Sequence, residues 1–143
     1  MMIMMNQAAF DTVQVGDKPV SFTLPPLSRL TLALYCGASG DHNPLHVDID
    51  FARSSGMPDV IAHGMLSMAY LGRLMTDWVP QSALRELSTR FSEMTHVGDE
   101  LTCVAEIIGK MKTDGEPRAR LKLTVTDQRG GVKLQGEAVV ALA

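Results

Sequence analysis

The chain has 143 residues, 45% of them hydrophobic and 20% charged, which is typical of one compact globular domain with a sizeable core. A formal net charge of -3 without a basic cluster argues against a nucleic-acid partner. No stretch approaches the roughly 20 apolar residues of a membrane span. The methionine-rich start lacks the features of an export signal and the two cysteines lie far apart, so we expect a cytoplasmic location.

The beginning of the chain predicts a loose start and then a strand. We expect residues 1–9 to be a flexible N-terminus and residues 10–143 to form a single domain. Residues 19–24 alternate between polar and apolar side chains, as a short edge strand does. Pro25 and Pro26 stop this strand because proline cannot donate to a sheet ladder.

Two helices are expected next, with an irregular loop at residues 39–47 between them. The first runs through Ala38, and the second is short. Residues typical of helix ends frame both elements, namely Ser28 and Gly40 for the first and Asp48, Asp50 and Gly56 for the second.

Residues 63–79 predict a different kind of helix. Apolar side chains lie nearly all round it, and only Arg73 and Asp77 are charged. Such a helix is expected to be buried on most sides, and Pro80 ends it.

The second half of the chain alternates with period two, which indicates strands. In the last strand Lys133 is expected on the polar face and Leu134 on the apolar face. Asp114-Gly115 and Gly130-Gly131 are hairpin turns, so the sheet should be mainly antiparallel and wrap the buried helix in an α+β fold. The expected strands cover residues 86–91, 101–108, 118–125 and 133–140.

Two segments concentrate polar groups beyond what folding needs, residues 39–46 and 61–65. In the first, Asp41 and His46 can converge if the loop folds back, and such a pair can bind one water and move protons. In the second, Gly64 follows His63 at a predicted helix start, where free backbone N–H groups can stabilise a developing oxyanion. The residues alone thus offer a base, an acid and an oxyanion donor.

Structural interpretations of the same residues remain open. Asp41 and Asn43 are also turn formers, and His46 suits a hydrogen-bonded structural role. His63 suits a helix cap or a hydrogen bond to a loop carbonyl. The helix face with Met65, Met68, Leu71 and Met75 favours core packing and also suits the lining of an acyl pocket. A stripe of basic residues on one predicted strand allows a phosphate contact. A group rich in histidine allows a metal site, although its spacing matches no familiar ligand pattern. These two groups are Arg118, Arg120 and Lys122, and His42, His46, Asp48 and His63.

The two polar segments together resemble the MaoC-like dehydratase family, which includes the R-specific enoyl-CoA hydratases. The pattern Asp-x-Asn-Pro-x-His followed by Ala-His-Gly-Met carries most of this resemblance. The matching residues, which span nearly the whole chain, are 15–17, 35–46, Asp48, 51–52, Gly56, 61–65, 90–91 and 97–101.

The resemblance implies a hot-dog fold, in which a curved antiparallel sheet wraps a long central helix. It implies that Asp41 and His46 hold the catalytic water and exchange its protons, while the Gly64 N–H binds the thioester carbonyl. It also suggests substrate contacts from Asn43, which otherwise supports the loop, and from His63 and Met65. The substrate would be a 2-enoyl thioester carried on coenzyme A or on acyl-carrier protein, with no metal and no redox cofactor.

The resemblance further implies a homodimer or higher oligomer, and some relatives work as unlike pairs.

One departure from the family pattern concerns the central helix. Some bacterial hydratases carry a serine there, whereas this chain has Gly72, with Ser67 and Tyr70 nearby. The alternatives to a hydratase are a thioesterase on the same fold and a non-catalytic or partner-dependent subunit of a heteromeric dehydratase.

Overall fold

A computed structural model of the protein describes residues 8–143. The expected flexible segment 1–9 lies mostly outside this range, and its last two residues, Ala8 and Ala9, already hydrogen bond within the domain. The elements in chain order are β1 (Val20–Thr23), α1 (Arg29–Ser39), η1 (Pro44–His46), α2 (Ile49–Ser54), α3 (Gly64–Trp78), η2 (Gln81–Ala83), β2 (Leu84–Phe91), β3 (Thr102–Thr113), β4 (Glu116–Thr126) and β5 (Val132–Ala141).

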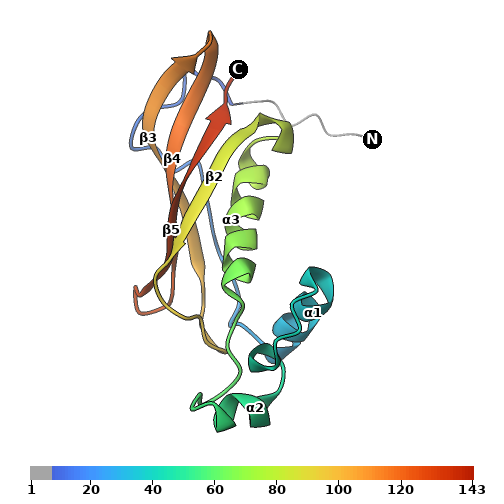
Figure 1. Ribbon diagram of the computed structural model, residues 1–143. Helices are drawn as coiled ribbons and strands as arrows, with labels where there is room; N and C mark the ends of the chain where they lie inside the picture. The colour runs from blue at the N-terminus through green and yellow to red at the C-terminus, as the bar shows by residue number, and fades with distance from the viewer. Residues whose placement is uncertain (1–7) are drawn as a thin grey trace.

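The five strands form one sheet in the order β1-β3-β4-β5-β2, and every neighbouring pair is antiparallel. Asp114 and Gly115 both adopt positive φ in the tight turn between β3 and β4, as predicted from the sequence. The sheet is curved and α3 lies along its concave side (Figure 1). This confirms the expected α+β arrangement of a sheet around one long helix.

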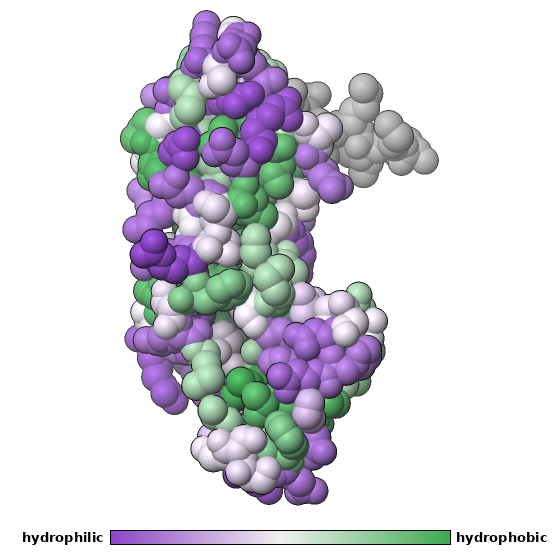
Figure 2. Space-filling model, viewed as in Figure 1, coloured by the Kyte–Doolittle hydropathy of each residue, from purple (hydrophilic) through white to green (hydrophobic). Residues whose placement is uncertain are grey.

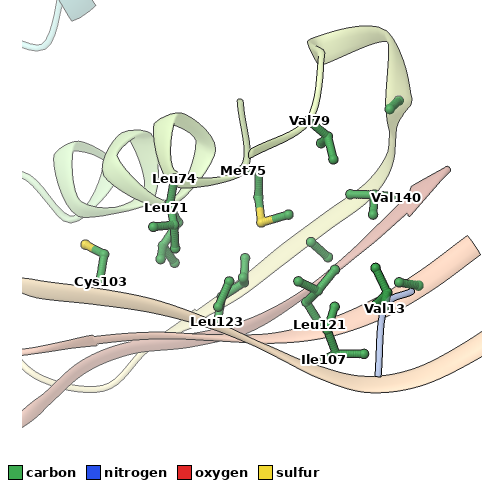
Figure 3. Packing of buried hydrophobic residues seen from close by; sticks show 14 of the residues in the cluster. Val13, Leu71, Leu74, Met75, Val79, Cys103, Ile107, Leu121, Leu123 and Val140 are labelled. Carbon is green, nitrogen blue, oxygen red and sulfur yellow. The ribbon is translucent and has the colours of Figure 1, made fainter. Parts of the chain in front are cut away.

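The main core lies between α3 and the sheet (Figure 3). Leu71, Leu74 and Met75 project from α3 into this core and have no exposed surface. A second, smaller cluster lies on the other side of α3, under α1 and α2, where Leu32 and Leu66 pack together. The N-terminal turns of α3 therefore contact this second cluster, whereas the rest of the helix packs on the sheet.

A third side of α3 remains exposed in the single chain, so the predicted burial on most sides is only partly correct. Met65, Ala69, Arg73 and Asp77 follow one another at four-residue spacing along this side. On the face shown in Figure 2, apolar and weakly polar residues gather over α3. The periodicity of the sequence cannot distinguish burial within one chain from burial against another chain.

The expected polar position of Lys133 on β5 is wrong, because this residue is only 4% exposed. Its ammonium group lies near the carboxylates of Asp127, Asp99 and Glu93. A charge that is paired in this way can be buried at a position that the alternation assigns to the surface. In residues 8–143 no helix has the length and apolarity to cross a bilayer.

Candidate active site

The loop that follows α1 is held by hydrogen bonds from its own side chains. Gly40 ends α1 in the left-handed conformation, and Ser39 Oγ accepts a hydrogen bond from the backbone N–H of Asp41 at 3.1 Å. Asp41 Oδ1 accepts from the N–H of Asn43 at 3.2 Å, and Asn43 Oδ1 accepts from the N–H of Leu45 at 3.0 Å. Asn43 thus caps the short turn of η1, which supports its predicted role in the loop.

His46 is oriented by a carbonyl group on a neighbouring segment. Its Nδ1 lies 2.8 Å from the carbonyl oxygen of Ile61. Because a carbonyl oxygen only accepts, Nδ1 carries the hydrogen, and the Nε2 of the neutral ring keeps a free lone pair. This Nε2 lies 3.9 Å from Asp41 Oδ2, which is too far for a direct hydrogen bond. A water about 2.8 Å from both atoms fits this separation.

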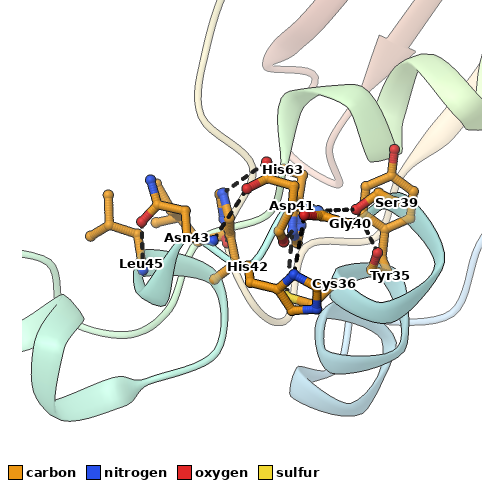
Figure 4. A network of polar contacts seen from close by, with 11 residues as sticks. Tyr35, Cys36, Ser39, Gly40, Asp41, His42, Asn43, Leu45 and His63 are labelled. Carbon is orange, nitrogen blue, oxygen red and sulfur yellow. Dashed lines mark hydrogen bonds and ion pairs between the residues drawn. The ribbon is translucent and has the colours of Figure 1, made fainter.

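His63 is buried and holds the backbone of Asp41. Its Nε2 donates to the carbonyl oxygen of Asp41 at 3.2 Å, and the ring lies beside the loop as Figure 4 shows. The ring stacks on His46 with 3.7 Å between centroids and meets Tyr35 edge-on at 4.8 Å. Burial lowers the pKa of His63, to which the neighbouring His46 adds a smaller effect. The structural alternative for His63, the binding of a loop carbonyl, is therefore supported.

The first turn of α3 faces the same place. The first backbone N–H groups of a helix have no intrahelical partner, and Gly64 is the first residue of α3. A Cβ placed on Gly64 would lie 2.9 Å from Cε1 of Phe91, so glycine allows Phe91 to lie against the helix start. Met65, which the resemblance suggested as a substrate contact, is 54% exposed and does not line the pocket beside His46.

A pocket of about 390 Å³ joins His46 to the start of α3. One wall is formed by the segment that follows β2, and this wall was not predicted from the sequence. Its lining residues are His46, Ile61, Ala62, Gly64, Phe91, Ser92, Glu93, Met94, Thr95 and Leu134. Leu71 and Met75, which the sequence suggested as possible acyl-pocket residues, are fully buried in the core.

Comparison with known proteins agrees with this geometry. Residues 7–128 match the family model of the MaoC like domain. The chain belongs to this family. An (R)-specific enoyl-CoA hydratase from Aeromonas caviae is 34% identical to the MaoC-like chain over 113 residues, which cover 78% of the chain and 83% of the relative.

Two further relatives show how far the similarity reaches. The unliganded R-hydratase structure from Pseudomonas aeruginosa has a TM-score of 0.84 at 28% identity, covering 95% of the MaoC-like chain and 86% of its own. A mitochondrial 3-hydroxyacyl-[acyl-carrier-protein] dehydratase from Arabidopsis thaliana is 30% identical over 79 residues, or 55% of this chain and 48% of that protein. The predicted family and its hot-dog fold are thus confirmed.

Three residues of types that can bind a metal ion lie close together in this MaoC-like site. Ligand atoms of Asp41, His46 and His63 lie within 4.8 Å of one another. His46 Nδ1 and His63 Nε2 donate to carbonyl oxygens, which leaves the lone pairs of His46 Nε2 and of the buried His63 Nδ1, unbonded within residues 8–143, besides a carboxylate oxygen of Asp41. Asp48 caps α2 instead. Three such groups are one fewer than the four ligands of a structural zinc site, and the absence of a metal stays a prediction.

The basic stripe on β4 is largely paired with acidic neighbours. Arg118 donates to Glu116 at 2.8 Å, and Arg120 donates to Glu137 at 2.8 Å. Glu116 also accepts from Arg85, and these hydrogen bonds lower the pKa of Glu116 to about 2. The geometry favours the interpretation of a solvated, charge-balanced face over that of a phosphate contact.

Sequence reasoning missed the pocket wall at residues 92–95 and the buried Lys133 behind it. The Arg90-Phe91 pair belongs to the family resemblance and was the one signal that pointed to this wall. Nothing in the spacing of residues 92–95 indicates that Thr95 O accepts a hydrogen bond from Ala62 N–H. That contact joins segments more than thirty positions apart, and only the folded chain reveals it.

Proposed function

We propose that this MaoC-like protein interconverts a trans-2-enoyl thioester and the corresponding R-3-hydroxyacyl thioester by adding or removing water. One observation carries the proposal. The lone pair of His46 Nε2 and the free oxygen of Asp41 lie 3.9 Å apart, beside a pocket that is also lined by Gly64 at the start of α3. A water held between the two groups has a proton acceptor next to it.

In the hydration direction, the oxygen of this water forms a bond to the β-carbon of the enoyl group. The Asp41–His46 pair takes one proton from the water, and the π electrons move toward the thioester carbonyl as an enolate. The pair then delivers a proton to the α-carbon, and the carbonyl double bond forms again. The elements of one water are added in full, and the reverse sequence is the dehydration.

The start of α3 supports the enolate in this proposal. The Gly64 N–H and the positive end of the helix dipole would face the carbonyl oxygen as negative charge develops on it. The absence of a side chain at Gly64 keeps this approach open beside Phe91. The addition of water involves no net oxidation or reduction of the substrate, so we expect no redox cofactor. We also expect no metal. The acyl group would be carried on coenzyme A or on acyl-carrier protein.

We also propose a homodimer, with an unlike pair as the alternative. The large exposed apolar side chains Phe91 and Met94 line the pocket. The strand β2 lies at one end of the sheet order, so its outer backbone groups are unpaired within the sheet. Pairing β2 of two copies would extend the sheet and cover this surface. Light scattering of the purified protein would give the mass, and a monomer would contradict this part of the proposal.

The two buried free thiols, Cys36 and Cys103, are compatible with the cytoplasmic location expected from the sequence. This location remains part of the proposal. Fractionation of the cells that produce the protein would test it.

The decisive experiment measures the loss of enoyl absorbance when the protein meets crotonyl-CoA and a longer 2-enoyl-CoA. We expect turnover by the wild type, and a kcat lower by about 10²–10⁴ in Asp41→Asn, since a positioned acid–base group contributes that much. Asp50→Asn is the matched control, because Asp50 is an exposed carboxylate in the first turn of α2. Chiral analysis of the product should show the R isomer.

Other outcomes would contradict the proposal. Release of free coenzyme A with the double bond intact would show a thioesterase. Full turnover by folded Asp41→Asn would show that the pair does not handle the water. A folded wild type that hydrates none of these thioesters, and no acyl-carrier-protein thioester either, would favour a non-catalytic subunit.

A further inference from the structure

Lys133 is a buried lysine that the proposed chemistry does not use. It is 4% exposed, and its Nζ lies 3.0 Å from the carbonyl oxygen of Met94. Three carboxylate oxygens surround it at 3.1 Å for Asp127, 3.5 Å for Glu93 and 3.6 Å for Asp99. A buried ammonium group needs such partners, and removing it would leave these oxygens facing each other without a cation.

The partners of Lys133 come from two separate parts of the chain. Asp127 lies in the hairpin between β4 and β5, where its Oδ1 accepts from the N–H groups of Arg129 and Gly131. The other partners belong to residues 92–99, which we call the wall segment, between β2 and β3. Lys133 therefore ties the wall segment to the hairpin between β4 and β5, two neighbouring strands of the sheet.

The wall segment is attached to Lys133 through the backbone as well. The N–H of Ser92 donates to the carbonyl oxygen of Lys133 at 2.9 Å. Inside the segment, Asp99 Oδ2 accepts from the N–H of His96 at 2.8 Å, which closes it into a compact turn. Lys133 thus holds both the first residues of the wall segment and the carboxylate that shapes its far end.

The wall segment reaches the candidate active site in two ways. Ser92, Glu93, Met94 and Thr95 line the pocket together with His46 and Gly64. In addition, the carbonyl oxygen of Thr95 accepts from the N–H of Ala62 at 2.9 Å, and Ile61 forms a β-bridge with His96. The carbonyl of Ile61 is the group that orients His46.

We propose that Lys133 is a positioning residue that fixes the wall segment, and through it the shape of the substrate pocket and the strand-like residues 61–62 beside His46. This inference rests on the proposed hydratase function. Lys133 lies behind the wall and does not itself line the pocket. Its effect must therefore pass through the residues of the wall segment, and mainly through substrate binding.

The test compares Lys133→Met with the wild type in enoyl-CoA hydration and in amide hydrogen exchange, below the melting temperature of the variant. We expect KM to rise roughly tenfold with kcat changed much less, because binding is weakened more than the chemical step. We also expect faster exchange of the Ala62 and Ser92 amides, with the β3–β4 ladder unchanged. Lys18→Met, at an exposed lysine, is the control and should change neither measurement.

If Lys133→Met does not fold, Asp127→Asn replaces it, because Asp127 contacts Lys133 but does not line the pocket. We expect the same direction of change, with a smaller size. Unchanged KM together with unchanged exchange in the folded variant would overturn the inference. A wild type without hydratase activity would instead contradict the proposed function, while the exchange measurement still tests whether Lys133 fixes the wall segment.

Discussion

His46 and His63 lie face to face, with their ring centroids 3.7 Å apart and their planes 22° from parallel. His46 belongs to the proposed catalytic pair, and His63 holds the backbone carbonyl of the other member, Asp41. His63 therefore contacts both members of the pair, His46 through the ring stack and Asp41 through the hydrogen bond. A positive charge on the buried His63 would lie against a second imidazole, so this ring is expected to stay neutral near pH 7.

The stability of the protein should consequently fall as the solution becomes acidic. Burial lowers the pKa of His63 below 6.5, and His46 lowers it further, whereas hydrogen bonding and charge from Asp41 oppose this. The unfolded chain then binds more protons than the folded one between the lowered pKa and about 6.5. The contribution of His63 to the free energy of unfolding is fully present above about pH 6.5, and it is lost as the pH falls toward the lowered pKa of the folded state.

Thermal melts between about pH 7.5 and 5 would measure this dependence. In His63→Gln, which keeps a hydrogen-bond donor, we expect a flatter dependence of the melting temperature on pH. His42→Gln is the control, because His42 is exposed and bonds only within its own loop. An equally steep dependence in His63→Gln would show that another group is responsible.

Substitution of Gly64 by alanine should impair activity through Phe91. The new Cβ would lie 2.9 Å from Cε1 of Phe91, so the ring must shift at the point where the substrate carbonyl is proposed to bind. We expect kcat/KM to fall by about 10² because small misplacements at a reacting centre have effects of this size.

The double variant Gly64→Ala, Phe91→Leu should recover part of the lost kcat/KM if the clash is the cause, because leucine is smaller than phenylalanine. Gly72→Ala tests the same change where a Cβ meets nothing within 4 Å. It should raise the melting temperature, since alanine favours a helix over glycine by about 1 kcal/mol. No recovery in the double variant would mean that Gly64 matters for a reason other than Phe91.

Asn43 should affect both stability and turnover, unlike a comparable cap nearby. Its side chain accepts from the N–H of Leu45, and its own N–H donates to Asp41, so it connects η1 to the proposed catalytic carboxylate. Asp48 caps α2 by accepting from the N–H groups of Asp50 and Phe51. Alanine at either position should lower the free energy of unfolding by about 1 kcal/mol.

The kinetic measurement separates the two variants. Asn43→Ala should lower kcat because the loop holding Asp41 loosens, whereas Asp48→Ala should leave kcat near the wild-type value. Equal kcat values in the two variants would show that the cap at Asn43 serves stability alone.

Local features of the sequence predict most of the elements. Ser28 and Gly40 mark the ends of α1, and Asp48 marks the start of α2, because helix ends require these hydrogen bonds and dihedral angles wherever they occur. Period-two alternation locates β4 well, since its buried and partly exposed residues follow the pleat. The same rule fails at Lys133, where distant carboxylates make burial possible.

The sequence by itself determined the candidate pair, Asp41 and His46, and the glycine at the start of the central helix. The tertiary structure decided the rest of the site: the stack of His63 on His46, the position of Phe91 over Gly64, and the wall segment held by Lys133. Residue types and short spacings predict hydrogen bonds between residues only a few positions apart along the chain. Contacts between segments far apart depend on how the sheet and α3 pack, and only the folded chain contains that information.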